Sequence, residues 1–125
     1  MLPLCKDRGI GVIPWSPLAR GRLTRDWDET TARSETDEFG KSLYSEGDKK
    51  VVDTLAEFSK IRRLKRAQVA LAWVLQKDVV AAPIVGATKP EHITDAVEAL
   101  SIKLSAEDIK LLEQPYEPHA VQGFK

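Results

Sequence analysis

Two short runs of apolar residues are the clearest feature of the hydrophobic pattern. Residues 10–14 read IGVIP and residues 79–85 read VVAAPIV, with no charged position in either run. Continuous apolar runs of strand length are typical of parallel strands that are covered on both faces. Each run leads into a loop that contains glycine. We therefore expect two buried parallel strands whose loops lie on the same side of a sheet.

The residues between these two runs show helical spacing. In residues 51–61 the apolar positions recur as Val51, Val52, Leu55, Phe58 and Ile61, which predicts a helix packed along one face. Residues 66–77 are apolar almost all round, so they predict a second helix that is buried on most sides, with Trp73 in the core.

Two further helices are predicted after the second apolar run. The segment TKPE at residues 88–91 has the form of a capping box, with Thr88 as the N-cap and Pro90 in the first turn. Its helix would carry one apolar face, made by Ile93, Ala96, Val97 and Leu100. Ser105 begins a last helix in the same way, with Ile109 and Leu112 as its apolar positions.

The remaining segments are predicted to be the end of a helix, a long loop and a tail. Residues 1–8 resemble the last turns of a helix that turns Leu4 and Cys5 inward and ends at Gly9, so we expect the chain to begin within a helix. Residues 26–50 are polar and irregular, which predicts a loop anchored by a few apolar residues: Trp27, Phe39, Leu43 and Tyr44. Residues 115–125 predict an extended strap.

Strand, helices and strand in this order form a βαβ unit, which implies a parallel sheet. Two strands alone do not make a stable parallel sheet, because their faces and edges need neighbours. The chain therefore resembles a piece of a larger α/β protein, and its exposed strand edges are candidates for association. In (β/α)₈ barrels a phosphate site is often built from the loops after strands 7 and 8. We expect a partial (β/α)₈ TIM barrel, its C-terminal part.

Composition narrows the class of protein. The 125 residues contain 19 Lys plus Arg and 19 Asp plus Glu, so the net charge is zero. This balance argues against nucleic acid or a membrane surface as partner. The basic run at residues 60–66 lacks aromatic neighbours and is interpreted as a solvated corner. The single cysteine, Cys5, forms no internal disulfide, no cluster has the spacing of metal ligands, and no signal peptide is visible, so we expect a cytoplasmic protein.

The segment IGVIPWSPLARGRLTR, residues 10–25, is the first candidate site. Trp15 offers an aromatic face, Ser16 a hydroxyl, Gly21 a permissive backbone, and two arginines positive charge at the mouth of a strand. These groups suit a flat, anionic, heteroaromatic ligand. The alternative is a strand, a turn and an ordinary surface loop. A second candidate follows residues 79–85, where the start of a helix suits a phosphate.

The phrases GVIPWSPLARGRLTR, AQVALAWVL, APIVGATKPEHI and LSAEDIKLLEQPYEPHAVQGFK together resemble the C-terminal part of aldo-keto reductases, in the branch with the potassium-channel β-subunits and many bacterial reductases. The resemblance covers the whole chain and implies a (β/α)₈ barrel that reduces aldehydes and ketones with NADPH. It divides the chain into strand 7 with a cofactor loop (1–50), a helical crossover (51–78), strand 8 with the following helices (79–114) and a C-terminal tail (115–125).

The resemblance also implies a set of cofactor-binding residues. Trp15 would stack on the nicotinamide. The loop around the pyrophosphate would be formed by Ser16, Pro17, Leu18, Arg20 and Gly21, with Arg25 matching its basic end by an offset of one. Arg33 resembles a cation that closes over the adenosine side; without the resemblance it would be a solvated surface charge.

The adenosine ribose, its 2′-phosphate and the adenine are implied to contact Gly86, Thr88, His92 and Asp95. Here the chain departs from the commoner family pattern: His92 stands where Gln or Arg is usual, and Ala96 where Asn is usual. Lys89 could supply charge to the 2′-phosphate instead, which favours NADP over NAD. For Asp95, a salt bridge on the helix face is an equally good explanation.

The family's catalytic Asp, Tyr, Lys and His have no counterpart in this chain. The two tyrosines, Tyr44 and Tyr116, and the two histidines, His92 and His119, lie in no matching motif. We therefore expect the cofactor-binding part of a reductase that is inactive alone and whose aldehyde or ketone substrate binds the longer parent protein. The alternatives are a half-barrel that binds a dinucleotide or docks on a reductase, and a gene fragment without function.

Overall fold

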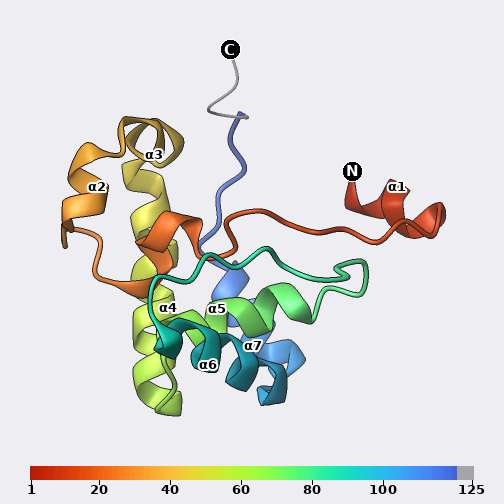
Figure 1. Ribbon diagram of the computed structural model, residues 1–125. Helices are drawn as coiled ribbons and strands as arrows, with labels where there is room; N and C mark the ends of the chain where they lie inside the picture. The colour runs from red at the N-terminus through yellow and green to blue at the C-terminus, as the bar shows by residue number, and fades with distance from the viewer. Residues whose placement is uncertain (121–125) are drawn as a thin grey trace.

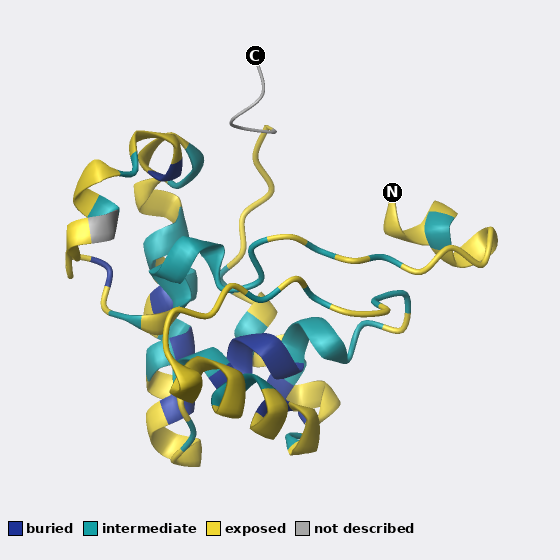
Figure 2. Cartoon of the chain, viewed as in Figure 1, coloured by how far each residue is buried: buried dark blue, intermediate teal, exposed yellow. Residues whose placement is uncertain are grey.

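The computed structural model describes residues 1–120, with only the backbone described at Arg33 (Figure 1). Its packed part is helical and comprises α4 (Lys49–Arg62), α5 (Arg66–Leu75) and α7 (Ala106–Glu113). Buried residues concentrate on α4 and α5, as Figure 2 shows. Both helices and the last helix begin close to where the hydrophobic pattern predicts them.

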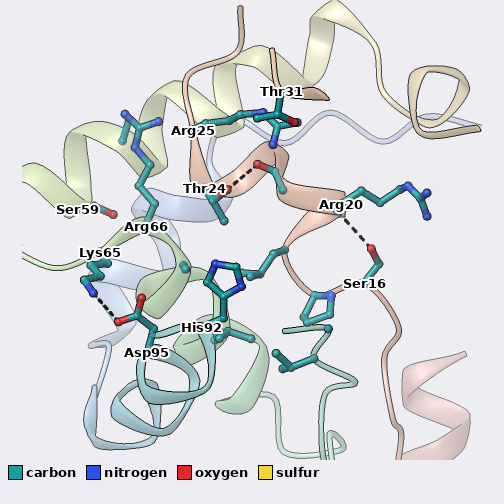
Figure 3. A pocket seen from close by; sticks show the side chains of 18 of the residues that line it. Ser16, Arg20, Thr24, Arg25, Thr31, Ser59, Lys65, Arg66, His92 and Asp95 are labelled. Atoms are coloured by element: carbon teal, nitrogen blue, oxygen red, sulfur yellow. Dashed lines mark hydrogen bonds and ion pairs between the residues drawn. The ribbon is translucent and has the colours of Figure 1, made fainter. Parts of the chain in front are cut away.

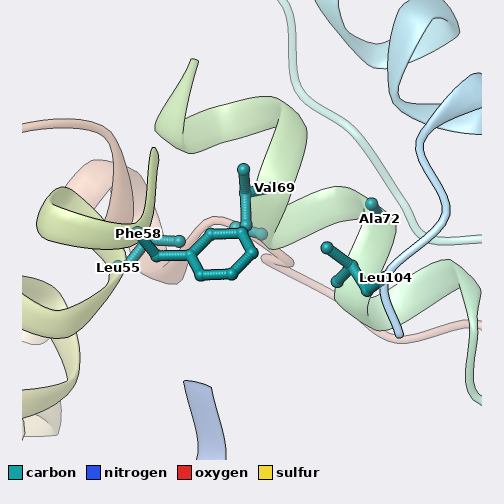
Figure 4. Packing of buried hydrophobic residues seen from close by; sticks show 6 residues of the cluster. Leu55, Phe58, Val69, Ala72 and Leu104 are labelled. Atoms are coloured by element: carbon teal, nitrogen blue, oxygen red, sulfur yellow. The ribbon is translucent and has the colours of Figure 1, made fainter. Parts of the chain in front are cut away.

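The core is a cluster of apolar side chains from α4, α5 and the segment before α7 (Figure 4). Its buried members are Leu55, Phe58, Val69, Ala70, Ala72 and Leu104. Trp73 packs against this cluster from its edge and donates its Nε1–H to Glu113 Oε1 at 3.0 Å. The prediction of a buried helix is thus confirmed for α5, whereas Ile61 at the end of α4 is 78% exposed and does not join the packed stripe.

A left-handed turn joins α4 to α5. Arg63 has φ +54°, and the amide of Leu64 donates to the carbonyl of Ser59 at 2.9 Å, which closes the end of α4. α5 then begins at Arg66, where the amide of Lys65 donates to Gln68 Oε1 at 3.2 Å. The turn places the last part of α4 beside the first part of α5.

The helix predicted after Thr88 is present as α6 (Pro90–Glu98), followed by the 3₁₀ turn η3 (Ala99–Ser101). The predicted capping box is wrong, because Lys89 is the N-cap and no side chain caps the helix. The amide of Thr88 instead donates to His92 Nδ1 at 3.3 Å. By contrast, Ser105 caps α7 as predicted, accepting from the amide of Asp108 at 3.1 Å. The apolar face of α6 is exposed.

The two apolar runs form extended segments that pair in parallel, as predicted. Two isolated bridges join them, Val12 with Val80 and Trp15 with Ile84, so neither run is a regular strand. Close approach is allowed by Gly11, where an added Cβ would lie 3.0 Å from Ala81 Cβ. The predicted burial is wrong: Ile10, Ile13 and Ile84 are 55%, 61% and 49% exposed, because no described residue covers them.

Residues 26–50 are more ordered than predicted. They contain α2 (Ala32–Thr36), α3 (Glu38–Leu43) and the 3₁₀ turn η2 (Glu46–Asp48). Side chains cap the first two, as Thr31 accepts from the amide of Ser34 and Asp37 from that of Gly40. Such short helices arise from local capping, which a hydrophobic pattern does not record. Trp27 is buried, as its predicted role as an anchor requires, whereas Phe39, predicted as another anchor, is 42% exposed.

The chain begins with α1 (Leu2–Asp7), which lies apart from the helical core in Figure 1. It ends before Gly9 at φ +64°, as predicted, but Leu4 is exposed. Of the predicted tail, residues 115–120 lack regular secondary structure and residues 121–125 lie outside the described part. Within residues 1–120, no helix is both long and apolar enough to cross a membrane.

Candidate dinucleotide site

An open cavity of about 1190 Å³ lies between the loop after the first extended segment, the turn from α4 to α5, and the start of α6 (Figure 3). It brings together residues that are far apart in the sequence. Of the residues predicted to bind the cofactor, the cavity is lined by Trp15, Ser16, Pro17, Leu18, Arg20, Gly21, Arg25, Gly86, Thr88, His92 and Asp95. The two candidate segments therefore contribute to a single concave surface.

The loop after Trp15 has an unusual backbone. Ser16 and Ala19 have positive φ, and the 3₁₀ segment η1 (Ala19–Thr24) is interrupted at Arg20 and Gly21, with φ of +54° and +89°. Non-glycine residues rarely adopt such angles, and they cluster at ligand-binding loops. The amide of Arg20 donates to Ser16 Oγ at 3.2 Å, which holds the turn closed beside Trp15.

Arg20 lines the cavity but uses its guanidinium elsewhere. Its Nε and Nη2 donate to the two carboxylate oxygens of Asp37 at 2.6 and 2.8 Å, in a half-buried bidentate pair. This hydrogen bonding raises the pKa of Arg20. The guanidinium also lies 5.7 Å from the ring centroids of Trp15 and Phe39. Arg20 therefore orders the loop around Trp15 and α3 more than it supplies free charge to the cavity.

Arg25 is a partly desolvated cation at the edge of the loop. Its guanidinium lies against the backbone of Gly21, where an added Cβ would come within 2.7 Å of Nη1. Its Nε donates to the carbonyl of Glu29 at 3.2 Å. Burial, followed by repulsion from Arg22, lowers the pKa of Arg25 below its ordinary value. Because these surroundings disfavour the charged form of Arg25, an anion bound beside it would stabilise that form.

The opposite wall is formed by α6 and its preceding loop. His92 Nδ1 accepts the amide hydrogen of Thr88, so the proton of a neutral imidazole sits on Nε2. Asp95 accepts from Lys65 Nζ at 2.7 Å, and this hydrogen bond raises the pKa of Lys65. The salt bridge proposed for Asp95 from sequence is thus present, in a residue that also lines the cavity.

Two predicted residues stand apart from this arrangement. Lys89, the N-cap of α6, is not among the residues that line the cavity, so it adds no side chain to the wall where a 2′-phosphate was expected. Arg33 lies in α2, and its side chain is outside the described part of the structure.

Several lining residues were missed from the sequence. They come from α4, α5 and the turn between them, and include Ser59, Lys60, Lys65 and Arg66. The lack of interleaved aromatic residues, the position at a helix junction and the neutral charge balance of the chain predict a solvated corner for the basic run at residues 60–66. The left-handed turn at Arg63 changes this, since it directs part of the run toward α6.

Two buried polar atoms of the cavity wall have no hydrogen-bond partner among the described residues. They are Ser59 Oγ and Arg66 Nη1. Buried donors and acceptors are nearly always paired in proteins, so each unpaired group calls for an explanation. Both atoms belong to residues that line the cavity. Within the same described part, no group of three or more His, Cys, Asp or Glu residues is placed to hold a metal ion.

Comparison with known proteins identifies the family. The sequence pattern of the Aldo/keto reductase family matches residues 1–117. The chain belongs to the aldo/keto reductase family. The resemblance inferred from the sequence phrases is thereby confirmed.

Individual relatives of this aldo/keto reductase chain agree with the family match. A Schizosaccharomyces pombe protein provisionally named an aryl-alcohol dehydrogenase is 46% identical over 98% of this chain and 35% of its own length. Versiconal hemiacetal acetate reductase of Aspergillus parasiticus is 39% identical over 97% of this chain and 36% of its own length. The chain therefore spans about a third of the length of these curated relatives.

A solved structure gives the corresponding result in three dimensions. A thermostable aldo-keto reductase, crystallised with the inhibitor epalrestat, superposes with a TM-score of 0.64 at 31% identity. The superposition covers 92% of this chain and 33% of that reductase. The arrangement of helices and extended segments thus matches one third of an aldo-keto reductase.

Proposed function

We propose that this chain forms the NADP-binding C-terminal part of an aldo-keto reductase, in which residues 10–14 and 80–85 correspond to strands 7 and 8 of a (β/α)₈ barrel. In the longer protein, bound NADPH would supply the hydride that converts an aldehyde or ketone to an alcohol. The observation that carries the proposal is the single cavity that collects residues of both candidate segments.

The residues of the cavity fit a nicotinamide dinucleotide. Sites for drug-sized ligands usually have about 300–1,000 Å³ and combine an apolar wall with a few polar groups. At about 1190 Å³ the cavity has room for a larger ligand such as a dinucleotide. Here Trp15 is exposed and available for stacking on a flat ring. Arg25, Lys60 and Arg66 add positive charge along the cavity.

We further propose that the chain alone does not reduce carbonyl compounds. Hydride addition leaves an alkoxide, so catalysis needs an acid that donates a proton to that oxygen. Tyr44 is not among the cavity residues, and burial raises its pKa, which opposes proton donation. Tyr116 and His119 also lie outside the cavity lining.

Cofactor binding is tested by titrating the chain with NADPH while tryptophan fluorescence is recorded. We expect saturable quenching in the wild-type chain and its loss in Trp15→Leu. Trp27→Phe serves as the matched control, because Trp27 is buried and does not line the cavity. A flat titration up to millimolar NADPH would contradict the proposal. NADPH oxidation with an aromatic aldehyde, above the rate of Trp15→Leu, would contradict the proposed inactivity.

A further inference from the structure

We infer that Asp37 is a positioning residue for the candidate dinucleotide site: it does not line the cavity, but it holds Arg20 over the ring of Trp15 and so fixes the loop that carries this ring. The inference rests on the proposed function, because it concerns the wall on which the nicotinamide half of the ligand would lie. Asp37 belongs to residues 26–50, which the sequence predicted to be an irregular loop. Its role follows from three-dimensional contacts alone.

The carboxylate of Asp37 is fixed from two sides. Its Oδ1 accepts the amide hydrogen of Gly40 at 2.9 Å, so Asp37 is the N-cap of α3. Both carboxylate oxygens also accept from Arg20, at 2.6 Å from Nε and 2.8 Å from Nη2. The side chains of Arg20 and Asp37 are only 19% and 15% exposed, unlike those of an ordinary surface pair. A bidentate pair of this kind defines the orientation of the guanidinium as well as its distance.

The pair depends on the absence of a side chain at position 40. Gly40 is buried in the first turn of α3. An added Cβ there would lie 2.5 Å from Asp37 Oδ2 and 3.2 Å from Arg20 Nε, which is too close for the carboxylate to stay in place. α3 therefore meets the loop without a side chain between them, and the position of this helix is coupled to that of Arg20.

The loop after Trp15 needs such support because its backbone is strained. Ser16, Ala19 and Arg20 have φ of +56°, +49° and +54°, in the left-handed region that residues with a Cβ rarely adopt. Such conformations persist only where the surrounding contacts determine them. Ser16 Oγ holds the amide of Arg20 within the loop, and Asp37 holds its guanidinium from outside. Asp37 thus supplies a contact from another element that keeps Arg20 in this conformation.

Arg20 transmits this constraint to the aromatic wall of the cavity. Its guanidinium lies 5.7 Å from the ring centroid of Trp15, within the range of cation–π contacts. Figure 3 shows its side chain pointing away from His92 and Asp95, so it does not extend toward the opposite wall. Trp15 is still 61% exposed, which leaves its ring open to a ligand. Without Asp37 the indole would turn more freely, and binding would then have to order it.

The experiment measures the affinity of the 125-residue chain for NADPH and for adenosine 2′-monophosphate, which lacks the nicotinamide and the pyrophosphate. We expect Asp37→Asn to weaken NADPH binding by about three- to tenfold, the range for one aromatic stacking contact. Binding of the monophosphate should change by less than about twofold, because it would contact the opposite wall. Gly40→Ala should show the same selective loss although it alters no charge, since its Cβ displaces the carboxylate.

Two matched controls lie in the same segment. Glu38→Gln also removes an acid from the start of α3, but its pair with Lys41 is exposed. Gly47→Ala also adds a Cβ, which would meet Ser45 Oγ at an ordinary contact distance of 3.5 Å. Neither substitution should change the affinity for either ligand.

The effect on the ring is measured by NMR without ligand, from the indole N–H signal of Trp15, which is assigned by its loss in Trp15→Leu. We expect this signal to shift or broaden in Asp37→Asn, whereas the signal of Trp73, bonded to Glu113, should stay in place and show that the core is folded. If Asp37→Asn fails to fold, Gly40→Ala decides by the same measurements.

Three results would overturn the inference while leaving the proposed function in place. They are equal losses of affinity for both ligands, an undiminished affinity for NADPH, and an unchanged Trp15 signal. Failure of the wild-type chain to bind NADPH would overturn both the inference and the proposed function.

Discussion

The helical core and the pair of extended segments both carry clear apolar patterns in sequence but differ in burial. Phe58 on α4 is 4% exposed, whereas Ile13 on the first extended segment is 61% exposed. The helices find their partners within this chain, because α4, α5 and α7 pack on one another. Within residues 1–120, the extended segments form bridges only with each other. The apolar pattern therefore identifies side chains that are suited to burial. Only the structure shows which of these side chains are covered.

The largest difference in the free energy of unfolding is expected between two substitutions on α4. Phe58→Ala removes a ring from the centre of the core and should lower the free energy of unfolding by about 3–5 kcal/mol. Ile61→Ala, one turn further along α4 and 78% exposed, should change it by less than about 0.5 kcal/mol. Urea unfolding followed by circular dichroism measures both. Similar effects of the two substitutions would mean that the core is not where the structure has it.

A second test compares two helix starts that have the same sequence signal. Ser105→Ala removes an N-cap hydrogen bond from α7 and should cost about 1 kcal/mol of the free energy of unfolding. Thr88→Ala should cost no more than about 0.5 kcal/mol, because its side chain caps nothing in the structure. Thermal unfolding of both variants gives the comparison. A cost at Thr88 equal to that at Ser105 would restore the capping box predicted from sequence.

The smallest effect is expected in the extended segments. Ile13→Ser replaces an exposed apolar side chain and should leave the stability of this chain within about 0.5 kcal/mol of the wild-type value. The same substitution in a full-length reductase should be strongly destabilising if residues 10–14 are a buried barrel strand. Chemical unfolding of both proteins is the measurement. A large loss in the short chain would show that residues 10–14 already pack against a partner.

The sequence predicted the parts of the fold that depend on periodicity. The helices α4, α5 and α7 follow from apolar spacing, and the parallel pairing of the extended segments follows from their order along the chain. The short helices α2 and α3 could not be predicted from apolar spacing, because single N-caps such as Thr31 determine them locally. The exposure of Ile10 and Ile84 could not be predicted either, since burial depends on contacts with residues that are distant in the sequence.

Residue types alone indicated the two segments of the candidate site, and the family resemblance added individual residues within them. The segments around Trp15 and His92 both line one cavity in the structure. Ser59 and Arg66 carry no motif, and their place in the cavity wall appears only in three dimensions. The left-handed conformation of Arg63 could not be predicted from the sequence either, since arginine is not a residue that favours positive φ.

This turn at Arg63 has a consequence for how ligand preference can change during evolution. Its backbone conformation sets the angle between α4 and α5, and both helices contribute residues to the cavity wall. A β-branched residue at position 63 would resist that conformation and rotate one helix against the other. The shape of the cavity would then differ although every residue lining it was unaltered, so an inventory of contact residues alone would not account for the change in ligand binding.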